Sequence, residues 1–266
     1  MDYKKIKVAF LVGLPISIAL RFLQLWFTVE TDTGFFKHNF RALGNYISFI
    51  IFLIAMTLAV FGFFGRRIPQ NPPKATIPLG VVSVAYAISV LYEIFTDNIT
   101  STAIMPWQLT ALKLTGIISA VFFVVFGLQS VANFRLPDIC AIAPMLYLIL
   151  RIICDFTAIS SLAMISDNLM LMGAYCTSLW FMLQFAKLYN QTDTKYNTKK
   201  LVSSGLAAVT LCFSQSLPHI LINIFSGYNY LHTTVSANFN LLILGIFILI
   251  FLISHFGKSA YKHSAN

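Results

Sequence analysis

The chain has 266 residues, of which 58% are hydrophobic and only 10% are charged, and its mean hydropathy is +0.79. A soluble domain carries about 25% charged residues, so this composition excludes a soluble fold and leaves no room for a separate soluble domain. The net charge of +9 does not indicate nucleic-acid binding, because no basic patch is interleaved with surface aromatics.

Eight apolar runs are long enough to cross a bilayer, which takes about 20 helical residues. They predict helices at about 8–28, 44–64, 77–96, 112–132, 139–158, 168–188, 201–223 and 237–257. We therefore expect an all-α integral membrane protein in which residues 1–266 form a single transmembrane bundle. Its eight transmembrane helices are expected to follow one another as four consecutive hairpins.

Basic residues are distributed unevenly over the connections between these runs. Only Lys37, Arg41 and Lys113 belong to the connections after odd-numbered runs, whereas thirteen belong to the other connections and the chain ends. The thirteen are Lys4, Lys5, Lys7, Arg66, Arg67, Lys74, Arg135, Lys187, Lys195, Lys199, Lys200, Lys258 and Lys262. Because cytoplasmic loops are rich in lysine and arginine, we expect a multi-pass protein of the cell membrane with the N-terminus and C-terminus both cytoplasmic.

Four charged residues fall inside the predicted spans, and their charges cancel. Arg21 and Arg151 are basic, and Glu93 and Asp155 are acidic. Charges in hydrocarbon are costly and tend to pair with each other or to face a wet cavity. Arg151 and Asp155 are four residues apart, which places them on one helix face. The pattern predicts an ion pair inside the fifth span.

Polar residues recur at corresponding positions of the odd-numbered spans. The series Arg21, Ser89, Arg151 and Gln215 is separated by 68, 62 and 64 residues, which is about one helical hairpin. Glu93, Asp155 and His219 follow Ser89, Arg151 and Gln215 by four residues and are also polar. We expect the four positions to converge. The alternative is that similar hairpins resemble each other only because hydropathy requires it.

Prolines support an inward position for the odd helices. Pro15, Pro144 and Pro218 lie inside odd-numbered runs, and no even run has an interior proline. Proline frees a carbonyl group and bends the helix, which lipid tolerates only where neighbouring helices cover the freed backbone. We therefore expect the odd helices to lie inward and the even helices, rich in Phe, Ile and Leu, to face lipid.

Three short motifs carry a resemblance to known proteins. They are Thr33-Gly34-Phe35-Phe36 after the arginine-bearing first span, Arg151 with Asp155-Phe156, and Ser166-Asp167-Asn168. With these motifs the chain resembles a set of uncharacterised small multi-span membrane proteins of Gram-positive bacteria. The resemblance covers most of the chain and implies no activity and no site.

The polar positions allow two interpretations. In the first they line a pocket open to the outer side, where arginines bind a carboxylate or phosphate and carboxylates bind an amine or a proton. In the second they form a closed set of salt bridges and hydrogen bonds that only joins the helices. The candidate substrate-binding residues are Arg21, Ser89, Glu93, Arg151, Asp155, Gln215 and His219.

The preferred hypothesis is a transporter, or the membrane-embedded solute-binding subunit of one, for a small charged solute. Its expected partners are the lipid bilayer, the solute and a partner membrane subunit or ATPase, but no nucleic acid. The alternative is a non-catalytic accessory, sensor or immunity protein whose intramembrane charges are structural. Because the motifs of metalloproteases, serine hydrolases and P-loop enzymes are absent, we expect no enzyme and no cofactor or metal.

Overall fold

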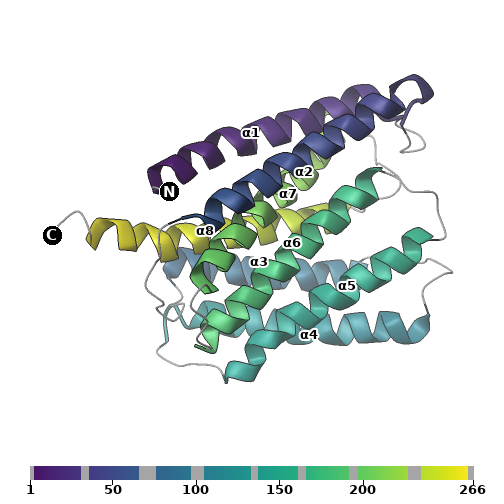
Figure 1. Ribbon diagram of the computed structural model, residues 1–266. Helices are drawn as coiled ribbons and strands as arrows, with labels where there is room; N and C mark the ends of the chain where they lie inside the picture. Colours follow the sequence, from purple (N-terminus) through teal and green to yellow (C-terminus); the bar gives the residue numbers. More distant parts are fainter. Residues whose placement is uncertain are drawn as a thin grey trace.

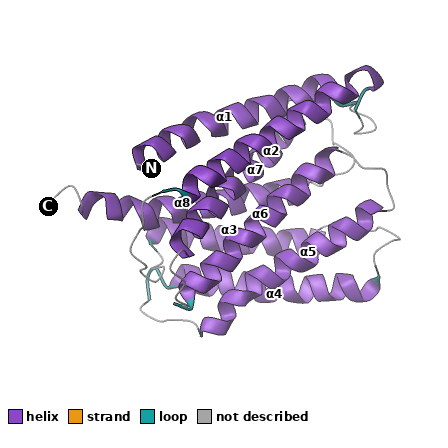
Figure 2. Ribbon diagram, in the orientation of Figure 1, coloured by secondary structure: helices purple, strands orange, loops and turns teal. Residues whose placement is uncertain are grey.

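In a computed structural model of the protein, the described residues are 3–30, 36–65, 76–96, 105–132, 137–160, 166–191, 197–226 and 235–262. Over these ranges the chain contains no strand, and one β-bridge joins Val29 to Phe36. The long helices are α1 (Tyr3–Thr28), α2 (Arg41–Phe63), α3 (Ile77–Thr96), α4 (Pro106–Leu128), α5 (Ala143–Ser160), α6 (Ser166–Tyr189), α7 (Asn197–Ser226) and α8 (Val235–Lys262). They run along one bundle (Figure 1) and are joined by loops and two short 3-10 helices (Figure 2), His38–Phe40 and Asp138–Ile142.

Eight helices in the described part of the chain are long and apolar enough to cross a membrane. This confirms the predicted all-helical chain with eight spans and indicates a multi-pass membrane protein. The predicted run at 112–132 differs most, because α4 begins earlier, at Pro106. Proline suits the first turn of a helix, and the Gln108 side chain accepts a hydrogen bond of 3.0 Å from the Met105 backbone N–H. These caps extend the helix beyond the apolar run.

Pro144 lies in the first turn of α5 and not in the helix interior, which corrects one of the proline predictions. It is the second residue of α5 and follows the 3-10 helix Asp138–Ile142. The first turn of a helix needs no intrahelical partner for its N–H groups, so Pro144 begins α5 and does not bend it. Pro15 and Pro218 do lie inside α1 and α7.

Burial does not alternate between odd and even helices. In the most apolar stretch of each span, the buried share of residues is 83% for α7 but only 22% for α1, while α6 and α8 reach 56%. Helix α7 packs against α1, α2, α6 and α8, whereas α1 packs mainly against α2 and α7. The prediction that odd helices lie inward therefore holds for α7 and is wrong for α1, because a helix at the rim has few neighbours to cover it.

Both chain ends lie at the same end of the bundle, here called the terminal end (Figure 1). Helices α4 and α6 run toward this end, while α1, α3, α5 and α7 run away from it. The side of the membrane that each end faces stays a prediction. Several basic residues behind that prediction lie outside the described residues, including Arg66, Arg67, Lys74 and Arg135.

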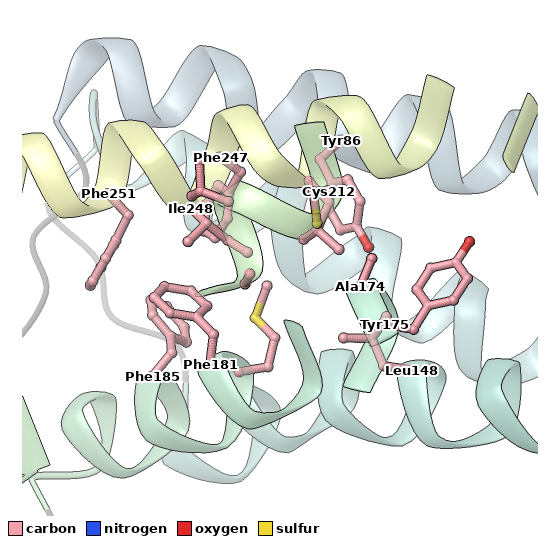
Figure 3. Close-up of a cluster of buried hydrophobic side chains, with 14 of the residues drawn as sticks. Tyr86, Leu148, Ala174, Tyr175, Phe181, Phe185, Cys212, Phe247, Ile248 and Phe251 are labelled. Atoms are coloured by element: carbon pink, nitrogen blue, oxygen red, sulfur yellow. The ribbon is translucent and has the colours of Figure 1, made fainter. Parts of the chain in front are cut away.

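A layer of aromatic rings fills the bundle between α4, α6 and α8. Figure 3 shows Phe181 and Phe185 of α6 facing Phe247 and Phe251 of α8. The ring centroids of Phe185 and Phe251 are 5.3 Å apart, with the planes at 72°, which is a favourable edge-to-face arrangement. The whole aromatic layer comprises Phe122, Phe123, Phe126, Phe181, Phe185, Tyr189, Phe247 and Phe251.

The backbones of α3 and α4 touch at Gly80 and Gly127. A Cβ atom on Gly127 would lie 2.7 Å from the carbonyl oxygen of Gly80, which cannot move aside as a flexible side chain does. We expect Gly127→Ala to separate the two helices and to cost about 1–3 kcal/mol. The measurement is the melting temperature (Tm) in detergent.

Gly13→Ala is the matched control for this variant. Its Cβ atom would meet side-chain methyl groups of Leu58 and Ile54, at 3.3 and 3.4 Å, and no backbone atom. Equal losses of Tm in Gly127→Ala and Gly13→Ala would contradict the expected close contact between α3 and α4.

Candidate functional site

All seven predicted site residues are buried, and none exposes more than 9% of its surface. Direct contacts between described residues assemble them in two groups. The ion group contains Ser89, Glu93, Arg151 and Asp155, and the arginine-amide group contains Arg21 and Gln215. The polar positions of α3 and α5 thus meet each other, and those of α1 and α7 meet each other.

The Arg151 guanidinium lies at the centre of the ion group. Its Nη1 atom is 3.0 Å from Oε1 of Glu93, and its Nε atom donates a hydrogen bond of 3.1 Å to Oδ2 of Asp155. The second contact is the pair that the spacing of four residues predicts on one helix. The first contact joins α5 to α3, so a single arginine bridges two carboxylates in the interior of the bundle.

Glu93 receives donors from two other helices, α5 and α8. Its Oε2 atom accepts a hydrogen bond of 3.1 Å from the Tyr147 hydroxyl of α5 and another from the Asn240 amide of α8. The Ser89 hydroxyl, one turn earlier on α3, donates to Oδ1 of Asn240 at 2.9 Å. The carboxylate of Glu93 is therefore anchored where α3, α5 and α8 meet.

Tyr175 of α6 covers the ion group with its ring. The Arg151 Cζ atom lies 5.9 Å from the ring centroid, within the range of a cation-π interaction. The Tyr175 side chain is 1% exposed, and its hydroxyl has no hydrogen-bond partner in the described part of the chain. A buried hydroxyl is normally paired, so this one marks a place where a further polar group would fit.

The arginine-amide group joins α1, α2 and α7. Arg21 donates to Oε1 of Gln24 at 2.5 Å and to Oε1 of Gln215 at 3.1 Å. The Gln24 amide in turn donates to the backbone oxygen of Gly44 and to the Ser48 hydroxyl of α2, at 2.6 and 2.7 Å. These contacts hold a fully buried arginine between neutral amides and tie the rim helix α1 to its neighbours.

His219 lies one turn beyond Gln215 on α7 and is fully buried. On their helices, Glu93, Asp155 and His219 each lie one turn beyond Ser89, Arg151 and Gln215. The contacts that place the ion group come from α3, α5, α6 and α8.

Replacing Gln24 tests the arginine-amide group. Gln24→Leu removes one acceptor of Arg21 and both hydrogen bonds to α2, and we expect it to cost about 1–3 kcal/mol because buried polar groups lose partners. The matched control is Gln129→Leu, which removes one hydrogen bond of 3.2 Å from a half-buried amide to Tyr189. A Tm of Gln24→Leu equal to or above that of Gln129→Leu would contradict the expectation.

Three residues that contact the ion group were not predicted from the sequence, namely Tyr147, Tyr175 and Asn240. Asn240 lies on an even-numbered run that was expected to face lipid, yet it is only 2% exposed. A signal was present, because an asparagine inside an apolar run is costly in lipid and therefore points to a partner. The two tyrosines gave no such signal, since tyrosine is common at membrane interfaces.

No group of three metal-ligating side chains occurs among the described residues. Comparisons with protein-family models, curated proteins and solved structures returned no match to this chain. Function is therefore inferred from the geometry of the ion group.

Proposed function

We propose that the protein is a membrane transporter, or the membrane-embedded solute-binding subunit of one, and that its ion group binds a small charged solute. The observation that carries the proposal is that Arg151 bridges Glu93 and Asp155 inside a bundle of membrane-spanning helices. Charged side chains in such positions are costly and commonly mark solute or ion pathways.

The surroundings of the ion group favour entry from one side. Asp155 is 9% exposed and is the most exposed of the three charged residues, while Glu93 is fully buried. Toward the terminal end the aromatic layer fills the space between α4, α6 and α8. If the termini are cytoplasmic, as the basic residues predict, a solute reaches the group from the outer side.

Energy for transport would come from outside the described helices. The described helices form a membrane-spanning bundle, so a partner ATPase is the proposed source of energy for ATP-driven transport, and a coupling ion is the proposed source for gradient-driven transport. Purification of the chain with its native membrane partners, followed by mass spectrometry, distinguishes ATP-driven from gradient-driven transport, because only the first predicts an ATPase among the partners.

A panel of small metabolites and ions tests solute binding through the Tm of the purified protein. A ligand that binds only the native state raises its stability, by about 2.7 kcal/mol at 100 times the dissociation constant. We expect a charged solute to raise the Tm of the wild type, and we expect Arg151→Gln and Asp155→Asn to change the size of that rise because each removes a charge from the ion group.

The second candidate function is a non-catalytic accessory, sensor or immunity protein with a structural ion group. It is favoured by the mutual pairing of Arg151, Glu93 and Asp155, which already places opposite charges together. If no solute changes the wild-type Tm while both variants melt much lower, the transport proposal is wrong and this candidate stands.

A further inference from the structure

We infer that the solute is a small organic cation with an ammonium or guanidinium group, and that it displaces Arg151 from Asp155 when it binds. This inference rests on the proposed transport function. It names the class of solute and the contact that is exchanged.

The charges of the ion group favour a cation over an anion. One guanidinium faces two carboxylates, so the three side chains carry a formal charge of −1 when all are ionised. An anionic solute would approach Glu93 and Asp155, which repel it, and would find Nη1 and Nε of Arg151 already engaged. A cationic solute is attracted by the same two carboxylates.

The two carboxylates differ in burial, since Glu93 is fully buried and Asp155 is 9% exposed. Glu93 accepts hydrogen bonds from Tyr147 and Asn240 in addition to its contact with Arg151. Asp155 lies on the same helix as Arg151 and at the more exposed edge of the group. Glu93 can therefore retain Arg151 while Asp155 exchanges the Nε contact for an incoming N–H group. Both carboxylates then keep a positive partner, which avoids the large cost of a buried unpaired charge.

Tyr175 supplies the remaining features of an organic-cation site. Its ring already lies 5.9 Å from the Arg151 guanidinium, and aromatic faces attract cations. Its buried hydroxyl, which has no partner in the described residues, can accept a hydrogen bond from an ammonium or guanidinium. An inorganic metal ion fits less well, because no cluster of three metal-ligating side chains is present in those residues.

The first test measures the Tm of the detergent-purified protein with methylammonium, methylguanidinium, potassium, acetate or methyl phosphate at equal ionic strength and millimolar concentration. We expect the two organic cations to raise the wild-type Tm by several degrees. Asp155→Asn should lose this rise. Glu30→Gln, which neutralises an exposed carboxylate away from the group, should keep it.

The second test is chemical rescue, which keeps the inference falsifiable if Asp155→Asn fails to fold. Arg151→Ala removes the internal cation, and methylguanidinium should restore part of the lost Tm by occupying its place between Glu93 and Asp155. The double variant Arg151→Ala with Asp155→Asn should regain less of its lost Tm in methylguanidinium, because one of the two carboxylates is missing. Equal recovery in the single and double variants would contradict a role for Asp155.

The outcomes separate the two proposals. If anions raise the wild-type Tm in an Arg151-dependent manner and organic cations do not, the solute class is wrong and the transport proposal stands. If no ion of either sign changes the wild-type Tm, and a wider metabolite panel also has no effect, the transport proposal fails together with the inference.

Discussion

Arg151→Gln is expected to destabilise the protein by about 3–5 kcal/mol, because removing one partner of a buried ion pair leaves an uncompensated charge. Here the loss affects two carboxylates at once, since the same guanidinium contacts Glu93 at 3.0 Å and Asp155 at 3.1 Å. The measurement is reversible unfolding in detergent, followed by circular dichroism or by tryptophan fluorescence.

Two controls accompany Arg151→Gln. Lys113→Gln removes an exposed positive charge from α4 and should leave the free energy of unfolding within about 0.5 kcal/mol of the wild type. The combination of Arg151→Gln with Glu93→Gln should cost less than the sum of the two single variants, because the residues are in direct contact. If the free-energy losses of the two single variants add strictly in the double variant, the contact between Arg151 and Glu93 contributes no stability.

Phe247→Ala is expected to cost about 3–5 kcal/mol by leaving a cavity in the aromatic layer. Phe247 is fully buried, and its ring centroid lies 5.2 Å from that of Phe123 and 6.3 Å from that of Phe185. Phe95→Ala is the control, since Phe95 is 71% exposed and loses few contacts inside the protein. A Tm of Phe247→Ala as high as that of Phe95→Ala would mean that the layer collapses around the missing ring.

The eight helices could be predicted because lipid leaves the chain little choice. Every backbone group in the bilayer must find an internal partner, so a long apolar run becomes a helix. The neighbours of each helix could not be predicted, because side chains that face lipid and side chains that face another helix are equally apolar. Helix α1 shows this limit, since its run resembles the others in hydropathy but is the least buried.

The candidate site could be predicted where its signal is local. Arg151 and Asp155 are four residues apart, and their contact follows from helix geometry alone. Glu93 was expected to have a basic partner, but which arginine it meets depends on how α3 and α5 approach each other. Asn240 reaches Glu93 only because α8 packs against α3, and no spacing rule covers a separation of 147 residues.

The contacts of Glu93 also have a consequence for how the protein is made. Its donors Tyr147 and Asn240 follow it by 54 and 147 residues, so neither has been synthesised when α3 enters the membrane. During translation the carboxylate must be accommodated by the insertion machinery or by water, since a charge is costly in lipid. Glu93 can acquire Tyr147 only after α5 is inserted and Asn240 only after α8 is inserted.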